Sequence, residues 1–199
     1  MKTSTILFGA LYFYMFFFMT SCASTKVTGE WKDPNLAAKQ YKKIMVMGVA
    51  KQPQDRKFYE DEFVRQLQAK GVEAVSSHTL IQHENMWEKE TIVQTIEGMD
   101  FDGVIITQVQ RSKERAKYKS HNYNMYDYYN HSYAIAPYYH RGTTTYQQQF
   151  GFESNLYDAK TQKLVFSLAS DTYAQDNIRK RLGSYIETVV NKLVQNNLI

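Results

Sequence analysis

Histidine, carboxylate and serine side chains are the groups in this sequence that could carry out catalysis, and their spacing matches no common catalytic motif. The chain contains no phosphate-cradling glycine loop, no G-x-S-x-G elbow and no H-E-x-x-H motif. Ser77, His78 and His83 follow a predicted strand, at the carboxyl edge where open α/β sheets bind ligands. A divergent hydrolase near His78 therefore stays open as the least favoured function.

Two further polar groups are weaker candidates. The acidic residues 60–62 lie consecutively on a predicted helix, where neighbours point in different directions, so we expect a solvated helix start rather than an acid/base pair. His121, His131 and His140 could join Asp127 around a transition metal, but their spacing matches no tight ligand motif. We therefore expect no metal, no cofactor and no enzymatic activity.

The N-terminal segment has the layout of a secretory signal. Lys2 supplies a positive start, and Ile6 to Met19 is a run without formal charge. The run is shorter than the roughly 20 apolar residues that a membrane-spanning helix needs. An uncleaved membrane anchor is the alternative.

Cys22, the only cysteine, follows this run. The residues M-T-S-C at 19–22 resemble the lipobox read by the lipoprotein signal peptidase, with Met19 where a branched apolar residue is preferred. The resemblance implies lipidation of Cys22, removal of residues 1–21 and a durable acyl anchor. Ala23 at the next position is similar to lipoproteins sorted to the outer membrane, and the alternative is an ordinary cysteine near a conventional cleavage site.

Composition places the rest of the chain among single-domain globular proteins. With 199 residues, 43% of them hydrophobic, one sizeable core can form. The net charge of +4 is too weak to indicate nucleic acid as a partner. A lone cysteine allows no internal disulfide, so stability must come from packing.

Hydrophobic periodicity predicts an α/β fold. We expect residues 22–40 to form a lipidated cysteine and tether, and residues 41–199 to form one domain. Buried strands are predicted at 44–49, 72–76 and 104–106, half-buried ones at 146–156 and 164–168, and helices between or after them, near 55–70, 92–99 and 182–193. The order βαβαβββα predicts a mixed sheet, with a βαβαβ start, an antiparallel β-hairpin and flanking helices.

A tyrosine-rich insert at 118–142 and a preceding basic stretch are the unusual features. Ordered connections this long are uncommon, so the insert is either a flexible loop or a hairpin-like contact surface. The basic residues occupy alternate positions, which would either solvate and protect a sheet edge or contact anionic lipid headgroups or an acidic partner. The candidate partner-binding residues are Tyr123, Tyr126, Tyr128, Tyr129, Tyr138, Tyr139, Arg111, Lys113 and Arg115, and the basic alternation continues to Lys117 and Lys119.

Four segments carry a family resemblance: W-x-D-P at 31–34, KKIMVMGV at 42–49, the helix at 58–67 and FDGVIITQV at 101–109. Together they resemble an uncharacterised family of small bacterial envelope lipoproteins. The topology is also similar to the TolB N-terminal region, CsgG and LpoB. The resemblance implies an envelope role through protein contacts, with no catalytic residues to transfer.

We therefore expect a lipid-anchored accessory or binding domain at the periplasmic face of the outer membrane. It would act through contacts with other envelope proteins. The alternative from another class is a small-ligand or glycan-binding module, which a deep pocket with convergent polar groups would favour.

Overall fold

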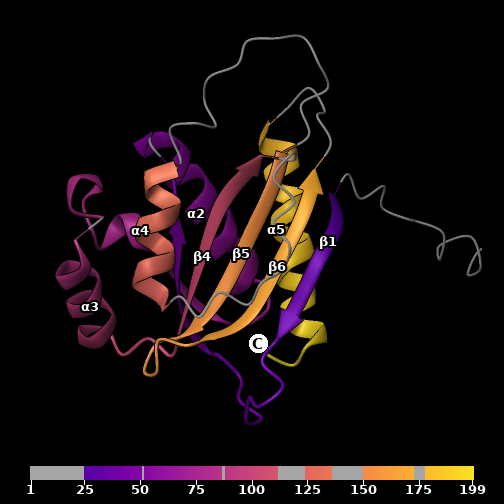
Figure 1. Ribbon diagram of the computed structural model, residues 1–199, viewed down its shortest axis with the longest axis horizontal. Coiled ribbons are helices and arrows are strands. Elements are labelled where there is room, and N and C mark those ends of the chain that lie inside the picture. The colour runs from indigo at the N-terminus through magenta and orange to yellow at the C-terminus, as the bar shows by residue number, and fades with distance from the viewer. Residues whose placement is uncertain (1–24, 51, 87, 112–123, 136–149, 173–177) are drawn as a thin grey trace, which may run out of the picture.

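The computed structural model describes residues 25–50, 52–86, 88–111, 124–135, 150–172 and 178–199. These residues form one six-stranded mixed sheet flanked by helices (Figure 1), which confirms the predicted α/β class. The strand order is β1-β6-β5-β4-β2-β3. The strands are β1 (Thr25–Lys32), β2 (Lys43–Gly48), β3 (Glu73–Ser76), β4 (Gly103–Arg111), β5 (Phe150–Asp158) and β6 (Leu164–Thr172).

Strands β2, β3 and β4 form the parallel half of the sheet, and β4, β5, β6 and β1 form the antiparallel half. The apolar run of β2 is buried on both sides: Ile44 and Val46 face one core cluster, while Met45 and Met47 face the other. A continuous apolar run is what a strand covered on both faces requires. The predicted hairpin of β5 and β6 is confirmed, with Leu156 opposite Phe166.

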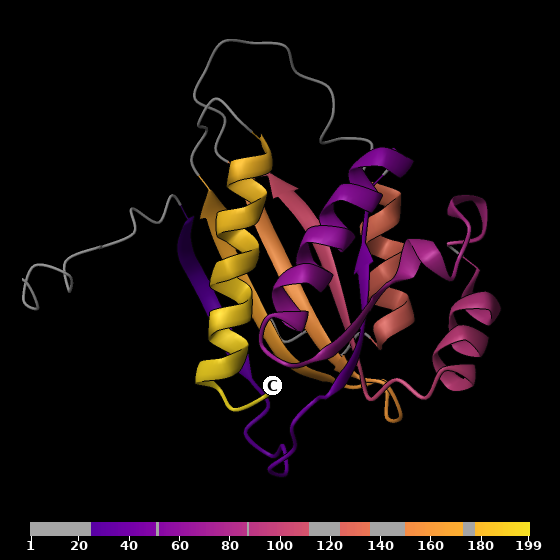
Figure 2. The same ribbon diagram turned by 180° about the vertical axis from the view of Figure 1, so that it is seen from behind.

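Two helices cover one face of the sheet and two cover the other. Figure 2 shows α2 (Pro53–Gln68) and α5 (Ile178–Gln195) on one face, and Figure 1 shows α4 (Met125–Ile135) on the opposite one, where α3 (Lys89–Gly98) also packs. Tyr59, Phe63 and Leu67 are buried at the helical spacing that the sequence indicated. The chain leaves α2 through Gly71, whose φ of 83° lies in the left-handed region that favours glycine.

The expectation of a tether over residues 22–40 is wrong for its central part. Strand β1 occupies residues 25–32 and pairs antiparallel with β6, placing Thr25 opposite Thr172 and Lys32 opposite Phe166. Its side chains alternate between half-buried and exposed, because an edge strand packs on one face only. Gly29 and several polar residues interrupt the alternation of apolar and polar side chains, so the sequence of this segment does not indicate a strand.

The tyrosine-rich insert contains a helix rather than only a loop or hairpin. Asn124 caps α4, since its Oδ1 accepts hydrogen bonds from the backbone N–H groups of Tyr126 and Asp127, both at 3.0 Å. Met125 and Tyr128 are buried one helical turn apart. A cap residue followed by this spacing is a local helix signal that the tyrosine content obscured.

Candidate functional site

Polar side chains gather at the carboxyl ends of β2 and β3, where the sequence placed its best candidate for a site. Strand β2 ends at Gly48, and β3 ends at Ser76 and is followed by a short 3-10 turn, Ser77–Thr79. Helix α2 packs against both strands and against this turn. The residues at this edge form a buried network and a surface pair.

Glu60 is the centre of the buried network, with none of its surface exposed. Its Oε1 accepts hydrogen bonds from the Gly48 backbone N–H at 2.9 Å, from Arg56 Nε at 3.0 Å and from Ser77 Oγ at 2.7 Å. Its Oε2 accepts the backbone N–H of His78 at 2.7 Å. The carboxylate therefore joins the helix to the ends of both strands, and the expectation that residues 60–62 are all solvated is wrong for Glu60.

Arg56 supplies the compensating charge and is itself only 1% exposed. Its Nη2 donates to Ser77 Oγ at 2.9 Å, and its Nη1 lies 3.8 Å from the sulfur of Met86. A buried ion pair is tolerated when further hydrogen bonds satisfy both partners, as they do here. Every oxygen of Glu60 is occupied from within the protein, so the network is suited to holding elements together.

His78 and Asp61 form the surface pair beside this network. His78 Nε2 lies 2.6 Å from Asp61 Oδ1, which also accepts a hydrogen bond from Ser76 Oγ at 3.0 Å. Lys57 Nζ donates to Asp61 Oδ2 at 2.8 Å. Burial alone would raise the pKa of Asp61, but hydrogen bonds from His78, Lys57 and Ser76 outweigh it and lower the pKa to about 2.

A carboxylate beside an imidazole can orient a general base, but such a base needs a nucleophile to activate. Ser76 donates its hydroxyl proton to Asp61, and Ser77 donates its proton to Glu60. Neither serine is hydrogen bonded to the imidazole in the contacts of this site. Within the described part of the chain, no three histidine, cysteine or acidic residues are placed to hold a metal ion.

A second buried polar cluster crosses the core between α2 and α5. Tyr59 donates its hydroxyl to Thr107 Oγ1 at 2.6 Å, and hydrogen bonds continue from Thr107 to Ser154 and from Ser154 to Tyr185. Burial raises the pKa of Tyr59, so its phenol stays protonated as a donor. The chain of hydroxyls connects α2, β4, β5 and α5, which supports a role in fixing how the helices pack.

A shallow hollow of about 330 Å³ lies on the other face, between α3, α4 and the turn joining β5 to β6. This volume is near the lower end of the range for small-molecule sites, about 300–1,000 Å³. Polar and apolar side chains share its wall, and it lies away from the His78–Asp61 pair. Its lining residues are Val93, Ile96, Glu97, Asp100, Phe101, Tyr126, Ala159, Lys160 and Gln162.

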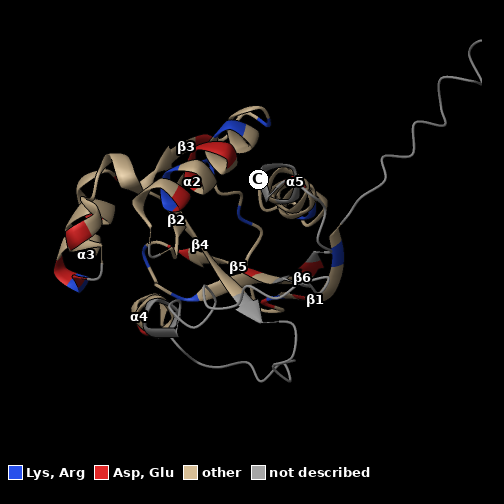
Figure 3. Cartoon of the chain, turned by 90° about the horizontal axis from the view of Figure 1, so that it is seen from above, with Lys and Arg blue, Asp and Glu red and all other residues tan. Residues whose placement is uncertain are grey.

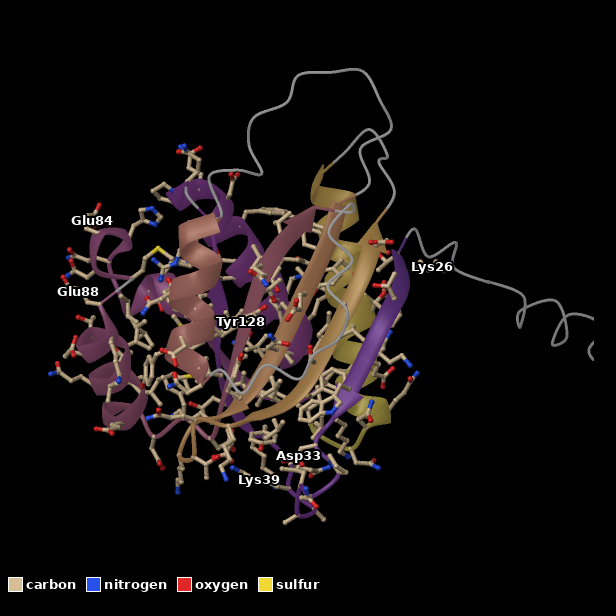
Figure 4. The ribbon with its side chains drawn as sticks, in the orientation of Figure 1. Lys26, Asp33, Lys39, Glu84, Glu88 and Tyr128 are labelled. Atoms are coloured by element: carbon tan, nitrogen blue, oxygen red, sulfur yellow. The ribbon has the colours of Figure 1, made fainter. Side chains whose placement is uncertain are left out.

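The predicted contact residues do not form one exposed surface. Tyr126, Tyr128 and Tyr129 are 4%, 7% and 1% exposed, because α4 packs them onto the sheet (Figure 4 labels Tyr128). Arg111 is the last residue of β4, and His131 lies on α4, but their side chains are outside the described part. Also outside the described residues are Cys22, Lys113, Arg115, Lys117, Lys119, Tyr123, Tyr138, Tyr139, His121 and His140.

The sequence analysis did not predict the buried network around Glu60, although the sequence contains part of the pattern that indicates it. Arg56 and Glu60 are four residues apart, the spacing of a helical ion pair. Tyr59 and Phe63 showed which face of α2 is buried, and Glu60 lies next to that face. The signal was missed because a charged residue beside an apolar stripe is usually solvated.

None of the described helices is long and apolar enough to cross a membrane.

No family model matches this chain, and no curated protein matches its sequence. Among solved structures, a PelC dodecamer from Paraburkholderia phytofirmans is similar, with a TM-score of 0.50 and 14% identity over 85% of this chain and 97% of that chain. A second structure of the PelC dodecamer gives a TM-score of 0.46 at 12% identity, over 87% and 96%. The lipoprotein GNA1162 from Neisseria meningitidis gives 0.40 at 13% identity, over 77% and 98%.

At these identities the comparisons bear on the fold alone, and only the first PelC structure is similar enough to support even that. That similarity covers most of both chains, so it is consistent with one α/β domain of similar size in each. TolB, CsgG and LpoB are not among these three structures, so that similarity stays a prediction.

Proposed function

We propose that this protein is a lipoprotein of the bacterial envelope, anchored through acyl chains on Cys22. Its α/β domain acts without catalysis, as an accessory that binds other envelope proteins at the periplasmic face of the outer membrane. The observation that carries the proposal is the sequence M-T-S-C at 19–22, directly ahead of a folded domain that begins at Thr25.

The position of the first strand supports this processing. All the strands and helices described lie at residue 25 and beyond, so cleavage after Ser21 would remove none of them. Only residues 23 and 24 separate Cys22 from β1. A signal that ends this close to the domain is compatible with a lipid anchor that holds the domain at the membrane surface.

The polar groups at the strand ends support a structural use of that edge. Glu60 accepts hydrogen bonds from the Gly48 backbone and from Ser77, and Ser77 also accepts one from Arg56. Ser76 donates its hydroxyl to Asp61. The contact residues for partners are then sought among other side chains. Arg111, Lys113, Arg115, Tyr123, Tyr138 and Tyr139 stay the candidates for partner contact.

Intact mass and membrane fractionation test the anchor. Wild-type protein and the Cys22→Ala and Ser21→Ala variants are expressed in a bacterial host that processes lipoproteins and fed an alkyne-labelled fatty acid. Wild type and Ser21→Ala, which keeps a small residue before the cysteine, should lose residues 1–21, gain acyl mass and sediment with membranes. Cys22→Ala should be unlabelled and unprocessed or released, and equal behaviour of all three proteins would refute the anchor.

Partner binding is tested separately by crosslinking in cells. The lipidated protein should crosslink to defined envelope proteins, and the complex should weaken when Arg111, Lys113 and Arg115 are replaced by glutamine. Recovery of no envelope protein above a Cys22→Ala control would count against the accessory role.

Self-association is a second candidate, favoured by the similarity to a structure described as a PelC dodecamer. Light scattering on the purified protein compares its mass in solution with that of one chain, which is 23.3 kDa before residues 1–21 are removed. A mass many times that of the chain would support assembly of copies, whereas a monomer across the accessible concentration range would exclude it.

A further inference from the structure

The hollow between α3, α4 and the turn joining β5 to β6 is lined by charges of both signs. Glu97 and Asp100 lie at the C-terminal end of α3, and Lys160 lies on the turn. All three residues are exposed, and within the described part of the chain neither carboxylate forms an ion pair with Lys160 or with another cation. Opposite charges that share one wall without pairing leave both signs available to a ligand.

The buried part of this wall is apolar apart from a phenol. Ile96 and Phe101 are 4% and 2% exposed. Tyr126 of α4 is also 4% exposed, and no described contact gives its hydroxyl a hydrogen-bond partner. Burial, and then the charge of Glu97, raise the pKa of Tyr126 to about 12, so the phenol keeps its proton. Buried polar groups are usually hydrogen bonded, so this hydroxyl is available to a ligand in the hollow.

The three walls of the hollow are joined to one another. Ala159 on the turn donates its backbone N–H to the carbonyl oxygen of Asp102, just after α3, at 3.1 Å. Lys89 of α3 places its Nζ 5.2 Å from the centre of the Tyr126 ring on α4. The hollow is therefore formed before any ligand binds, which lowers the cost of binding.

The two signs of charge lie on different walls. Figure 3 shows α3 and α4 beside each other, with acidic positions on α3. The turn carries Lys160 and Lys163, and the acidic residue before it, Asp158, is paired with Lys39 at 2.6 Å. A ligand with a cationic and an anionic end would therefore be oriented by the hollow.

We propose that this hollow binds a small zwitterion with an apolar side chain, which is an apolar α-amino acid or a short peptide of such residues. The ammonium group lies toward Glu97 and Asp100, the carboxylate toward Lys160, and the side chain against the apolar wall. Tyr126 donates its hydroxyl to the ligand. The volume of about 330 Å³ suits a ligand of one or two residues. This site goes beyond the proposed accessory role and does not depend on the lipid anchor.

A nuclear magnetic resonance titration of the ¹⁵N-labelled full-length protein in detergent tests the site with four compounds. Leucine and leucyl-leucine carry both charges, N-acetylleucine lacks the ammonium group, and leucinamide lacks the carboxylate. Leucine or leucyl-leucine should shift the backbone amide signals of residues 96–101 and 159–162, and the tighter of the two shows whether an amino acid or a peptide is preferred. Each compound with one charge should bind at least about ten-fold more weakly, because one side of the wall stays unpaired.

Two variants with matched controls assign the charges. The double variant Glu97→Gln, Asp100→Asn should weaken binding of the zwitterion about ten-fold and leave N-acetylleucine unaffected. Lys160→Gln should weaken the zwitterion similarly and leave leucinamide unaffected. The controls are Glu90→Gln and Lys163→Gln, which change exposed residues that do not line the hollow and should keep the wild-type affinity.

The variant Tyr126→Phe keeps the ring and removes the hydroxyl. It should weaken the zwitterion several-fold without lowering the melting temperature, because the phenol has no partner to lose. No shifts at about 10 mM of either zwitterion, shifts confined to other parts of the protein, or equal affinity for the compounds with one charge would overturn the proposal. Acylation of Cys22 without ligand binding would refute this site alone, and ligand binding without acylation would refute the anchor alone.

Discussion

The buried carboxylate of Glu60 provides the sharpest test of how this fold is held together. In Glu60→Leu, Arg56 keeps its charge at a site that is 1% exposed and loses its carboxylate partner. Removing one partner of a buried ion pair costs about 3–5 kcal/mol, and the backbone N–H groups of Gly48 and His78 also lose their acceptor. We expect the free energy of unfolding to fall by about 4 kcal/mol, a large part of the 5–15 kcal/mol typical of a domain.

A double-mutant cycle measures the coupling within this pair. Arg56→Met alone should cost a similar amount, because it leaves the Glu60 carboxylate buried without its cation. The double variant removes both charges and should be at least about 2 kcal/mol more stable than the sum of the single effects predicts. Urea denaturation followed by circular dichroism gives each value, and the Glu60→Leu midpoint should move by about 2 M.

The matched control is Glu62→Gln, two residues along the same helix. Glu62 pairs with Arg65, whose side chain is 67% exposed, so its removal should cost no more than about 0.5 kcal/mol. If Glu60→Leu were as mild as this control, or if the cycle were additive, the interpretation of a buried, coupled network would be wrong.

Three other perturbations test separate parts of the fold. Gly48→Ala places a Cβ 2.9 Å from the Tyr59 ring and should lower stability by about 1–3 kcal/mol in a urea titration, whereas Gly98→Ala, with open space around its Cβ, should not destabilise. Asn124→Ala removes the cap of α4 and should cost about 0.5–2 kcal/mol, with no loss falsifying the capping role. The pKa of Asp61 is lowered from 3.8 to about 2, so its stabilising effect is present above pH 3.8 and is lost as the pH falls through about 2. Melting curves of wild type and Asp61→Asn should accordingly converge at the acidic end, and a constant separation would contradict this linkage.

Much of the fold could be predicted because the burial of regular elements leaves a periodic record in the local sequence. The apolar run at 44–49 required a strand covered on both faces, and the stripe of Tyr59, Phe63 and Leu67 required a helix packed on one side. The alternation at Phe152 and Leu156 gave an antiparallel strand. Each of these patterns is complete within a few residues, so no knowledge of the rest of the chain was needed.

The tertiary structure alone decided the features whose partners lie far away in the chain. Strand β1 exists because β6, much later in the sequence, offers it a free edge, and its own mixed residues predict little. Glu60 is buried because Gly48, Arg56 and Ser77 converge on its carboxylate, although the sequence around it looks like a solvated helix start. The sequence by itself determined the main periodic elements, and it contains the lone cysteine and the M-T-S-C pattern on which the proposed anchor rests. Which polar groups enter the core, and which strands pair at the edge of the sheet, depended on contacts between segments that only folding brings together.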